Sequence, residues 1–496
     1  MQRGKKLKSL IAAGLLMAAT AATAAPAMAV EYSFSGMFRN YYDVSNVNVV
    51  RNEDVYGYMY LDNGAPTANV FETRLRTNFT MKFSEDLKLV TREEINYGFW
   101  GNSSYTAGRS SGGAIGSRGV NIETKRLYID ANFPTYNLNT KLGMQPFDDA
   151  YKGIFVSDDM PGFSISNTTK NLTTTIGAYR WNDGTLSTKP NTAYGKMTKD
   201  LISLDGKYEI NKDVKVGAAY YFMSSDNITG TLPDGTATLP NWNNIYGLYN
   251  GNENITLHMF GINGEATMGP LTLDGFFVYQ CGSNYLNKQH VSAFATNVGG
   301  RMKIGPGTLR SEFLFVSGGG NPNTPSSSND NGFIDTGIYN GFYNNEMVIL
   351  GRDKYAQIND NAIVYNVNNF NQGVIFGSFG YDLPITEKFK GSANMGFAAV
   401  AKDWGAPLIG NSTTNDPTNG SYGYKVNGPL AGGKHHSNYL GTEINAEVDY
   451  LLFPQLEIGL RGGYVFLGDY FKGTASNNTA DPDNPFAMKV IATLTF

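Results

Sequence analysis

Cysteine is nearly absent from this chain: Cys281 is the only one, so no intramolecular disulfide can form. Secreted soluble proteins of this size often carry disulfides, which makes that class a poor fit. The chain also has no excess of basic residues, because it contains 39 Lys and Arg and 43 Asp and Glu. Since nucleic-acid binding depends on clustered positive charge, we expect no nucleic acid among the partners.

Long apolar runs are also missing. After residue 30, no stretch approaches the ~18 consecutive apolar residues that a transmembrane helix needs. Nevertheless, aromatic residues make up 13% of the chain, and glycine is abundant at 58 residues. A transmembrane β-barrel reconciles these observations, because its strands alternate lipid-facing apolar residues with lumen-facing polar ones and its rims carry aromatic girdles.

The first 29 residues are typical of a secretory signal peptide. An apolar run over residues 10–22 is followed by small residues at Ala27 and Ala29, as a cleavage site requires. Four basic residues precede this run: Arg3, Lys5, Lys6 and Lys8. We therefore expect a mature domain of residues 30–496, a single barrel that keeps 35 of the 39 basic residues and no second domain.

Residues 70–83 show the clearest strand pattern. One face carries Phe71, Thr73, Leu75, Thr77, Phe79, Met81 and Phe83, and the other carries Glu72, Arg74, Arg76, Asn78, Thr80 and Lys82. Similar alternation recurs over residues 442–452 and 456–464. An aromatic face opposed by a charged one is what a wall between lipid and water requires. Glu93 departs from the alternation that begins at Leu89, so we expect either a β-bulge nearby or a position at the rim.

Short turns and long polar connections join the predicted strands alternately. The eight short turns are residues 84–86, 134–137, 169–171, 211–213, 269–270, 305–307, 384–388 and 453–455. The nine long connections lie near residues 43–68, 99–119, 146–161, 182–200, 225–252, 282–290, 319–369, 404–436 and 468–485. This is the topology of outer-membrane barrels, with short periplasmic turns and long extracellular loops. The sequence thus predicts an all-β, antiparallel up-and-down transmembrane barrel of about 18 strands (16–20) with both termini in the periplasm.

The end of the chain carries a distinct pattern. The predicted lipid face of residues 487–496 ends in an aromatic residue and comprises Val490, Ala492, Leu494 and Phe496. This resembles the carboxyl-terminal signal by which Gram-negative barrels are recognised for assembly, so Phe496 is the expected assembly signal and the barrel assembly machinery an expected partner. The expected location is the cell outer membrane, crossed many times.

Over its whole expected mature length the chain resembles Gram-negative outer-membrane porins. The stretches 141–150 and 153–162 are similar to the porin region where the fifth strand leads into the third loop. The chain is also similar to putative porins of metal-reducing bacteria, such as the OmpJ type. The resemblance implies a water-filled channel for passive diffusion of small hydrophilic solutes and ions, surrounding outer-membrane lipids, and a homotrimer. It also implies that residues 146–161 fold into the lumen and narrow it.

Charged residues suggest how such a constriction would work. The loop offers Asp148, Asp149, Asp158 and Asp159, and the wall offers Arg74, Arg76, Arg92 and also Arg39. Carboxylates opposite guanidiniums across a narrow waist would create a transverse field that penalises apolar solutes. The alternative is that these are ordinary solvated charges in a wide lumen or an external loop. The acidic composition further favours a weak preference for cations.

Other functions fit the sequence less well. None of the four histidines (His258, His290, His435 and His436) lies in a hydrolase motif, and no haem-attachment motif is present. We therefore expect no enzyme activity, metal or cofactor. One alternative is a structural barrel that sheathes or supports an outer-membrane electron-transfer cytochrome, which would need a wide lumen without an infolded third loop. A fatty-acid-type transporter is disfavoured, because residues 30–36 read as strand and leave nothing for an amino-terminal plug.

Overall fold

The computed structural model describes residues 30–47, 56–58, 61, 63–97, 100, 122–183, 198–225, 255–284, 289–320, 329–335, 346–357, 360–369, 371–403, 437–473 and 480–496. The predicted signal peptide therefore lies outside the described residues. Within them, no helix has the length and apolar character needed to cross a membrane. Almost all of the regular structure is strand.

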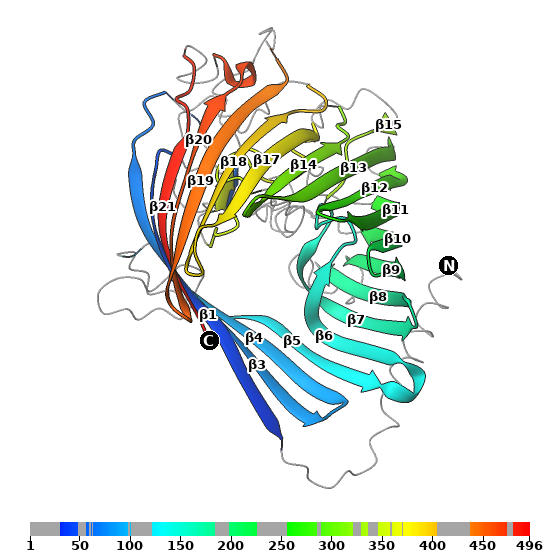
Figure 1. Ribbon diagram of the computed structural model, residues 1–496. Coiled ribbons are helices and arrows are strands. Elements are labelled where there is room, and N and C mark those ends of the chain that lie inside the picture. The colour runs from blue at the N-terminus through cyan, green and yellow to red at the C-terminus, as the bar shows by residue number, and fades with distance from the viewer. Residues whose placement is uncertain are drawn as a thin grey trace, which may run out of the picture.

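Eighteen long strands form one antiparallel sheet that closes on itself (Figure 1). They are β1 (Glu31–Ser45), β3 (Ala68–Ser84), β4 (Leu87–Tyr97), β5 (Ile122–Phe133), β6 (Leu138–Asp148), β7 (Ser157–Thr169), β8 (Leu172–Asp183), β9 (Thr198–Asn211), β10 (Val214–Ser225), β11 (Ile255–Met268), β12 (Leu271–Asn284), β13 (Gln289–Ile304), β14 (Gly307–Val316), β17 (Val374–Pro384), β18 (Phe389–Ala399), β19 (Tyr439–Phe453), β20 (Leu456–Leu467) and β21 (Phe486–Thr495). The short elements are β2 (Tyr56–Tyr58), β15 (Asn329–Asp330), β16 (Asp360–Ala362), η1 (Pro134–Tyr136) and η3 (Asp469–Phe471).

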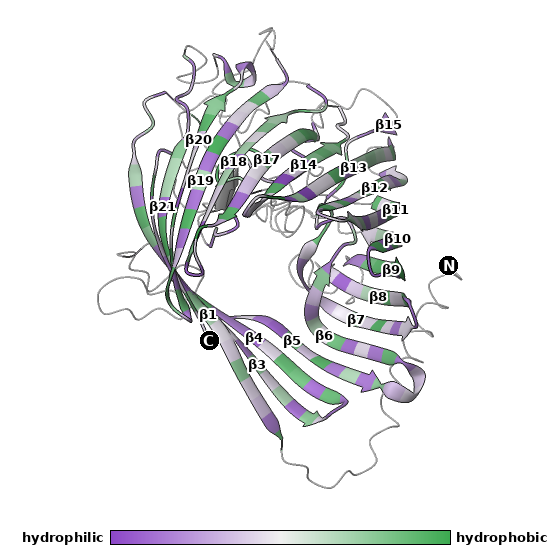
Figure 2. Ribbon diagram, viewed as in Figure 1, coloured by the Kyte–Doolittle hydropathy of each residue, from purple (hydrophilic) through white to green (hydrophobic). Residues whose placement is uncertain are grey.

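The strand number and the short turns agree with the sequence prediction. All eight predicted short turns connect neighbouring strands, from β3–β4 at one end of the chain to β19–β20 at the other. The wall also alternates as predicted: Phe71 and Phe83 are 40% and 41% exposed, whereas Glu72 between them is buried. Figure 2 shows this alternation of apolar and polar residues along the arrows. The register between β4 and β5 shifts at Arg92 and Glu93, so of the two expectations for Glu93 the bulge is correct.

Barrel closure depends on the pairing of β1 with β21. Strand β1 pairs with β3 along one edge and with β21 along the other, from Met37 opposite Thr495 to Ser45 opposite Ala487. The terminal residue extends this ladder, because Gly36 and Phe496 exchange two backbone hydrogen bonds of 2.7 and 3.1 Å. A Cβ on Gly36 would lie 2.6 Å from the Phe496 ring, so only glycine leaves room for that ring.

We expect deletion of Phe496 to impair membrane assembly far more than trimming the segment around Pro325, which lies outside the described residues. The deletion removes two seam hydrogen bonds and the contact between the Phe34 and Phe496 rings, whose centroids are 5.5 Å apart. Heat-modifiable migration of membrane-extracted protein measures the folded fraction. Normal amounts of folded, membrane-integrated protein from the truncated gene would contradict this role for Phe496.

Candidate functional site in the barrel lumen

The connection between the fifth and sixth barrel strands bends against the inner wall. The hydroxyl of Tyr151 donates to the carbonyl of Ala219 on β10 at 3.1 Å, and the backbone N–H of Ala150 donates to the Tyr221 hydroxyl at 2.8 Å. The Lys152 ammonium lies 2.6 Å from the Asp274 carboxylate on β12 and also contacts a carboxylate on β14. This connection comprises residues 149–156, which is shorter than the predicted 146–161, because residues 146–148 pair with 157–159 in the β6–β7 ladder.

Asp149 holds this connection together. Its buried carboxylate accepts backbone hydrogen bonds of 2.7–2.9 Å from Tyr151, Gly153, Phe155 and Val156. Burial raises the pKa of Asp149 to about 6, and the four N–H donors limit that rise. We predicted that Asp149 would be a fixed charge in the channel. It is instead an internal cap, because a carboxylate satisfies the N–H groups of a tight turn better than any neutral side chain does.

The other three predicted aspartates belong to strands. Asp148 ends β6, where it is exposed and accepts a hydrogen bond from the Ser157 hydroxyl. Asp158 and Asp159 are residues of β7, and Asp158 accepts from the N–H of Asp159 at 2.7 Å. Asp159 forms an ion pair of 2.6 Å with Arg126 on β5. The placement of these two residues in the loop was therefore wrong, because the β6–β7 ladder continues further than the polar sequence suggested.

Arg74 and Arg76 converge on a carboxylate that the sequence analysis did not single out. Arg76 Nε donates to Glu94 at 2.8 Å, and Arg74 Nη2 lies 3.3 Å from the same carboxylate. Arg74 also donates to the carbonyl of Gln357 at 2.6 Å. Glu94, on β4, is fully buried beside the two arginines of β3. Its spacing of two residues from Arg92 on the lumen face is the signal that would have identified it.

Five guanidiniums line one side of the lumen wall. They are Arg39, Arg74, Arg76, Arg92 and Arg126, which we call the arginine stripe. Within it, Arg39 lies directly opposite Arg74 in the β1–β3 ladder, and Arg92 lies directly opposite Arg126 in the β4–β5 ladder. Asp159 contacts the stripe through Arg126 and does not face it across a waist. We predicted loop carboxylates opposite wall guanidiniums, but the structure has carboxylates and guanidiniums side by side on nearby strands of the wall. The sequence analysis did not identify Arg126 as part of this site.

A second inward segment follows β14. The backbone N–H groups of Val348, Ile349 and Leu350 donate to the buried Glu443 carboxylate on β19 at 2.7, 3.0 and 2.6 Å. Part of residues 319–369, predicted as a long external connection, therefore packs against the wall inside the barrel. The apolar run at 347–350 within this polar stretch is the signal that would have predicted it.

A buried ionic network fixes the same segment to the last strands. Lys489 on β21 lies 2.7 Å from Asp353, and Arg461 Nε on β20 lies 3.4 Å from it, while Arg461 also pairs with Glu447. Burial raises the pKa of Asp353, but Lys489 and Arg461 outweigh burial and hold that pKa below its ordinary value. The Arg39 guanidinium lies over the Tyr355 ring at 4.9 Å, which connects this network to the arginine stripe.

Apolar packing fills part of the lumen. Side chains of both inward segments, including Phe155 and Leu350, belong to one buried cluster with inward-facing residues of β9–β14 such as Leu257 and Leu314. The Gln280 side chain on β12 also makes hydrogen bonds of 2.7 and 2.8 Å to the backbone of Ile334. The described lumen thus has an apolar side closed by packing and a charged side that carries the arginine stripe.

The histidines lie away from this site. His258 points outward from β11 and hydrogen bonds to the Tyr220 hydroxyl at 2.8 Å, and His290 is on β13. His435 and His436 lie outside the described residues. Within the described ranges, no three His, Cys, Asp or Glu residues are grouped in a way that could hold a metal ion.

No protein-family model matches this chain, and no curated protein matches it. Solved structures do. Pseudomonas aeruginosa OpdO is 11% identical with a TM-score of 0.51, over 94% of this chain and 97% of that one. OccK9 (OpdG) of the same organism is also 11% identical with a TM-score of 0.51, over 94% and 99%.

A BenF-like porin from Pseudomonas fluorescens Pf-5 is 12% identical with a TM-score of 0.49, over 94% of this chain and 98% of that one. At such identities the likeness to OpdO and OccK9 shows the fold alone. The shared fold is a closed, antiparallel β-barrel. The narrower resemblance to OmpJ-type porins stays a prediction.

We expect Asp149→Asn to loosen residues 149–156 without unfolding the barrel. An amide offers one oxygen to four N–H donors, so at least two of them lose their acceptor, at a cost of roughly 2–4 kcal/mol. Hydrogen exchange of the Tyr151 and Phe155 amides should accelerate by about 30-fold or more. The matched control is Asp148→Asn, whose exposed carboxylate receives no backbone N–H from this turn. Equal exchange in the two variants would contradict the capping role.

Replacing Arg74 and Arg76 by Ala should destabilise the barrel by about 3–5 kcal/mol, because Glu94 would remain buried as an unpaired carboxylate. Adding Glu94→Gln to the same variant should restore most of the loss. The temperature at which the folded band disappears in a heat-modifiability gel measures the effect. A double variant as heat-resistant as the unchanged protein would mean that Glu94 does not depend on these arginines.

Proposed function

We propose that this chain is an outer-membrane porin, a water-filled channel through which small hydrophilic solutes and ions diffuse passively. The observation that carries the proposal is the closed wall, apolar outside and charged inside, with inward segments that narrow its lumen. In this proposal the eight short turns face the periplasm and the wall crosses the outer membrane many times, surrounded by its lipids. Assembly by the barrel assembly machinery and a homotrimeric state, which the porin resemblance implies, belong to the same proposal.

Two lumen arginines that form no ion pair with any described residue favour solutes with an anionic group. Arg92 donates to the amide oxygen of Asn78 at 2.7 Å, and Arg39 donates to the Thr493 hydroxyl at 3.1 Å. Both acceptors are neutral, so these two guanidiniums keep a positive potential on the charged side of the lumen. This preference is the reverse of the one suggested by the acidic composition, because the Asp149 carboxylate is buried as the cap of its own turn and Asp159 is paired with Arg126.

The inward segments favour a solute channel over the alternative of a sheath for a cytochrome. A sheath needs a lumen wide enough for a protein. Residues 149–156 and the segment around 346–357 occupy part of that space. The first is bonded to the wall by the Tyr151 hydroxyl and the Lys152 ammonium, and the second by Glu443 and Arg461. A narrowed lumen with charges on one side suits small hydrated solutes.

Single-channel recording in planar bilayers tests the proposed function. We expect discrete, salt-dependent conductance steps from the purified, folded barrel. Folded protein that inserts into the bilayer without forming any conducting step would contradict the porin proposal and favour the structural alternative.

Neutralising Arg39 and Arg92 together as Arg39→Gln and Arg92→Gln should shift the reversal potential under a salt gradient toward cations. The shift should shrink between ~0.1 M and ~1 M salt, as the Debye length falls from about 10 Å to about 3 Å. The matched control is Arg180→Gln, which removes an outward-facing arginine that pairs with Asp200 at 2.9 Å. An equal shift in the control, or no shift in the double variant, would show that Arg39 and Arg92 do not set the ion selectivity of the channel.

A further inference from the structure

The barrel wall has a notch where β14 ends. Strand β13 begins at Gln289, but its pairing with β14 starts only at Ala295 opposite Val316, so six residues of β13 extend beyond β14 at the loop end of the barrel. Ser317 partly replaces the missing strand: its N–H donates to the Phe294 carbonyl, and its hydroxyl accepts from the Phe294 N–H, both at 2.9 Å. The chain then turns away from the ladder, and the two residues of β15 pair in parallel with His290 and Val291, so this edge of β13 has only short, partial neighbours.

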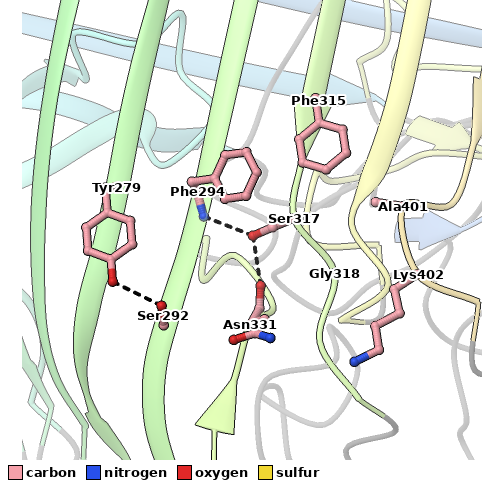
Figure 3. A pocket seen from close by; sticks show the side chains of 9 residues that line it. All are labelled: Tyr279, Ser292, Phe294, Phe315, Ser317, Gly318, Asn331, Ala401 and Lys402. Carbon is pink, nitrogen blue, oxygen red and sulfur yellow. Dashed lines mark hydrogen bonds between the residues drawn. The ribbon is translucent and has the colours of Figure 1, made fainter.

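A pocket of about 430 Å³ occupies this notch on the outside of the barrel (Figure 3). Its wall consists of outward-facing side chains, in which the Phe294 and Phe315 rings stack at 5.2 Å between centroids. Ser292 is small and bonds to the Tyr279 hydroxyl at 3.0 Å, so the pocket stays open above these rings. Its volume lies within the range of about 300–1,000 Å³ that is usual for ligand sites.

The rim of the pocket carries a cation. Among the described lining residues, Lys402 alone has a charged side chain, and it comes from the segment after β18. Lys402 is exposed, and it lines the pocket together with Asn331 (Figure 3). The neighbouring Asp403 does not line the pocket. Lining residues therefore offer aromatic surface at one end and an ammonium with an amide at the other.

We propose that this notch binds a phosphorylated lipid of the outer leaflet, with an acyl chain on the Phe294 and Phe315 rings and a phosphate at Lys402 and Asn331. The inference rests on the proposed function in one respect, because it takes the loop end of the wall to face the outer leaflet. At that boundary a lysine extends its apolar stem along the wall and holds its ammonium at the level of the lipid headgroups. The lining then matches such a lipid at both ends: apolar toward the hydrocarbon and cationic toward the phosphate.

Native mass spectrometry of the purified full barrel with diphosphoryl lipid A tests the proposal. We expect Lys402→Gln to weaken lipid A binding by about fivefold, as one lysine near anionic headgroups would. Lys402→Arg should retain binding, because the cation is kept. Ser292→Phe should lower binding by filling the pocket. The matched control is Lys212→Gln, which removes an exposed lysine from the turn between β9 and β10 at the opposite rim.

Four outcomes would overturn the proposal: equal binding by the unchanged protein and Lys402→Gln, an equal loss in Lys212→Gln, an equal loss for diacylglycerol of matched chain length, which has no phosphate, or displacement of lipid A by millimolar inorganic phosphate. The last would identify a site for free anions. Single-channel recording of Lys402→Gln separates this proposal from the porin function. Unchanged conductance with weakened lipid binding supports the lipid site on a working channel, whereas a barrel that binds lipid A without conducting contradicts only the porin function.

Discussion

The pairing of β1 with β21 is the interaction on which the rest of the structure depends. In a lipid environment an open sheet edge leaves backbone N–H and C=O groups without partners, at several kcal/mol for each group. The ladder from Met37 to Ser45, extended by Gly36 and Phe496, removes the last such edge. Once the sheet is closed, the period of two fixes which residues face outward and which face the lumen, so closure also places the charged side chains of the inner wall.

Carboxylates solve the problem that closure creates inside the barrel. A segment that enters the lumen brings backbone N–H groups away from bulk water, and these groups need acceptors. Asp149 supplies them within its own turn, and Glu443 supplies them from the wall to residues 348–350. Acidic residues that the sequence suggests as selectivity charges therefore have in part a structural role. The positive potential in the lumen comes from the arginines that are bonded to neutral groups.

Sequence reasoning succeeded where the determinants are local. Alternation over residues 70–83 and the eight turns depend on neighbours in the chain, and both agree with the structure. It failed for Asp158 and Asp159, because the length of the β6–β7 ladder depends on pairing between strands. The partnership of Glu94 with Arg76 likewise follows from register. Lumen packing comes instead from the connection between β14 and β17, which the prediction based on the amino terminus did not include.

The ionic network has a consequence for the order of assembly. Lys489 lies on the last strand opposite Asp43 of the first, and its buried ammonium lies 3.7 Å from Asp43 and 2.7 Å from Asp353 of the inward segment. If β21 came beside β1 without Asp353 in place, the buried ammonium would keep Asp43 but lose its nearer carboxylate, which costs free energy. The pairing of β21 with β1 and the docking of residues 346–357 are therefore energetically coupled. Closure of the barrel and narrowing of its lumen therefore favour each other.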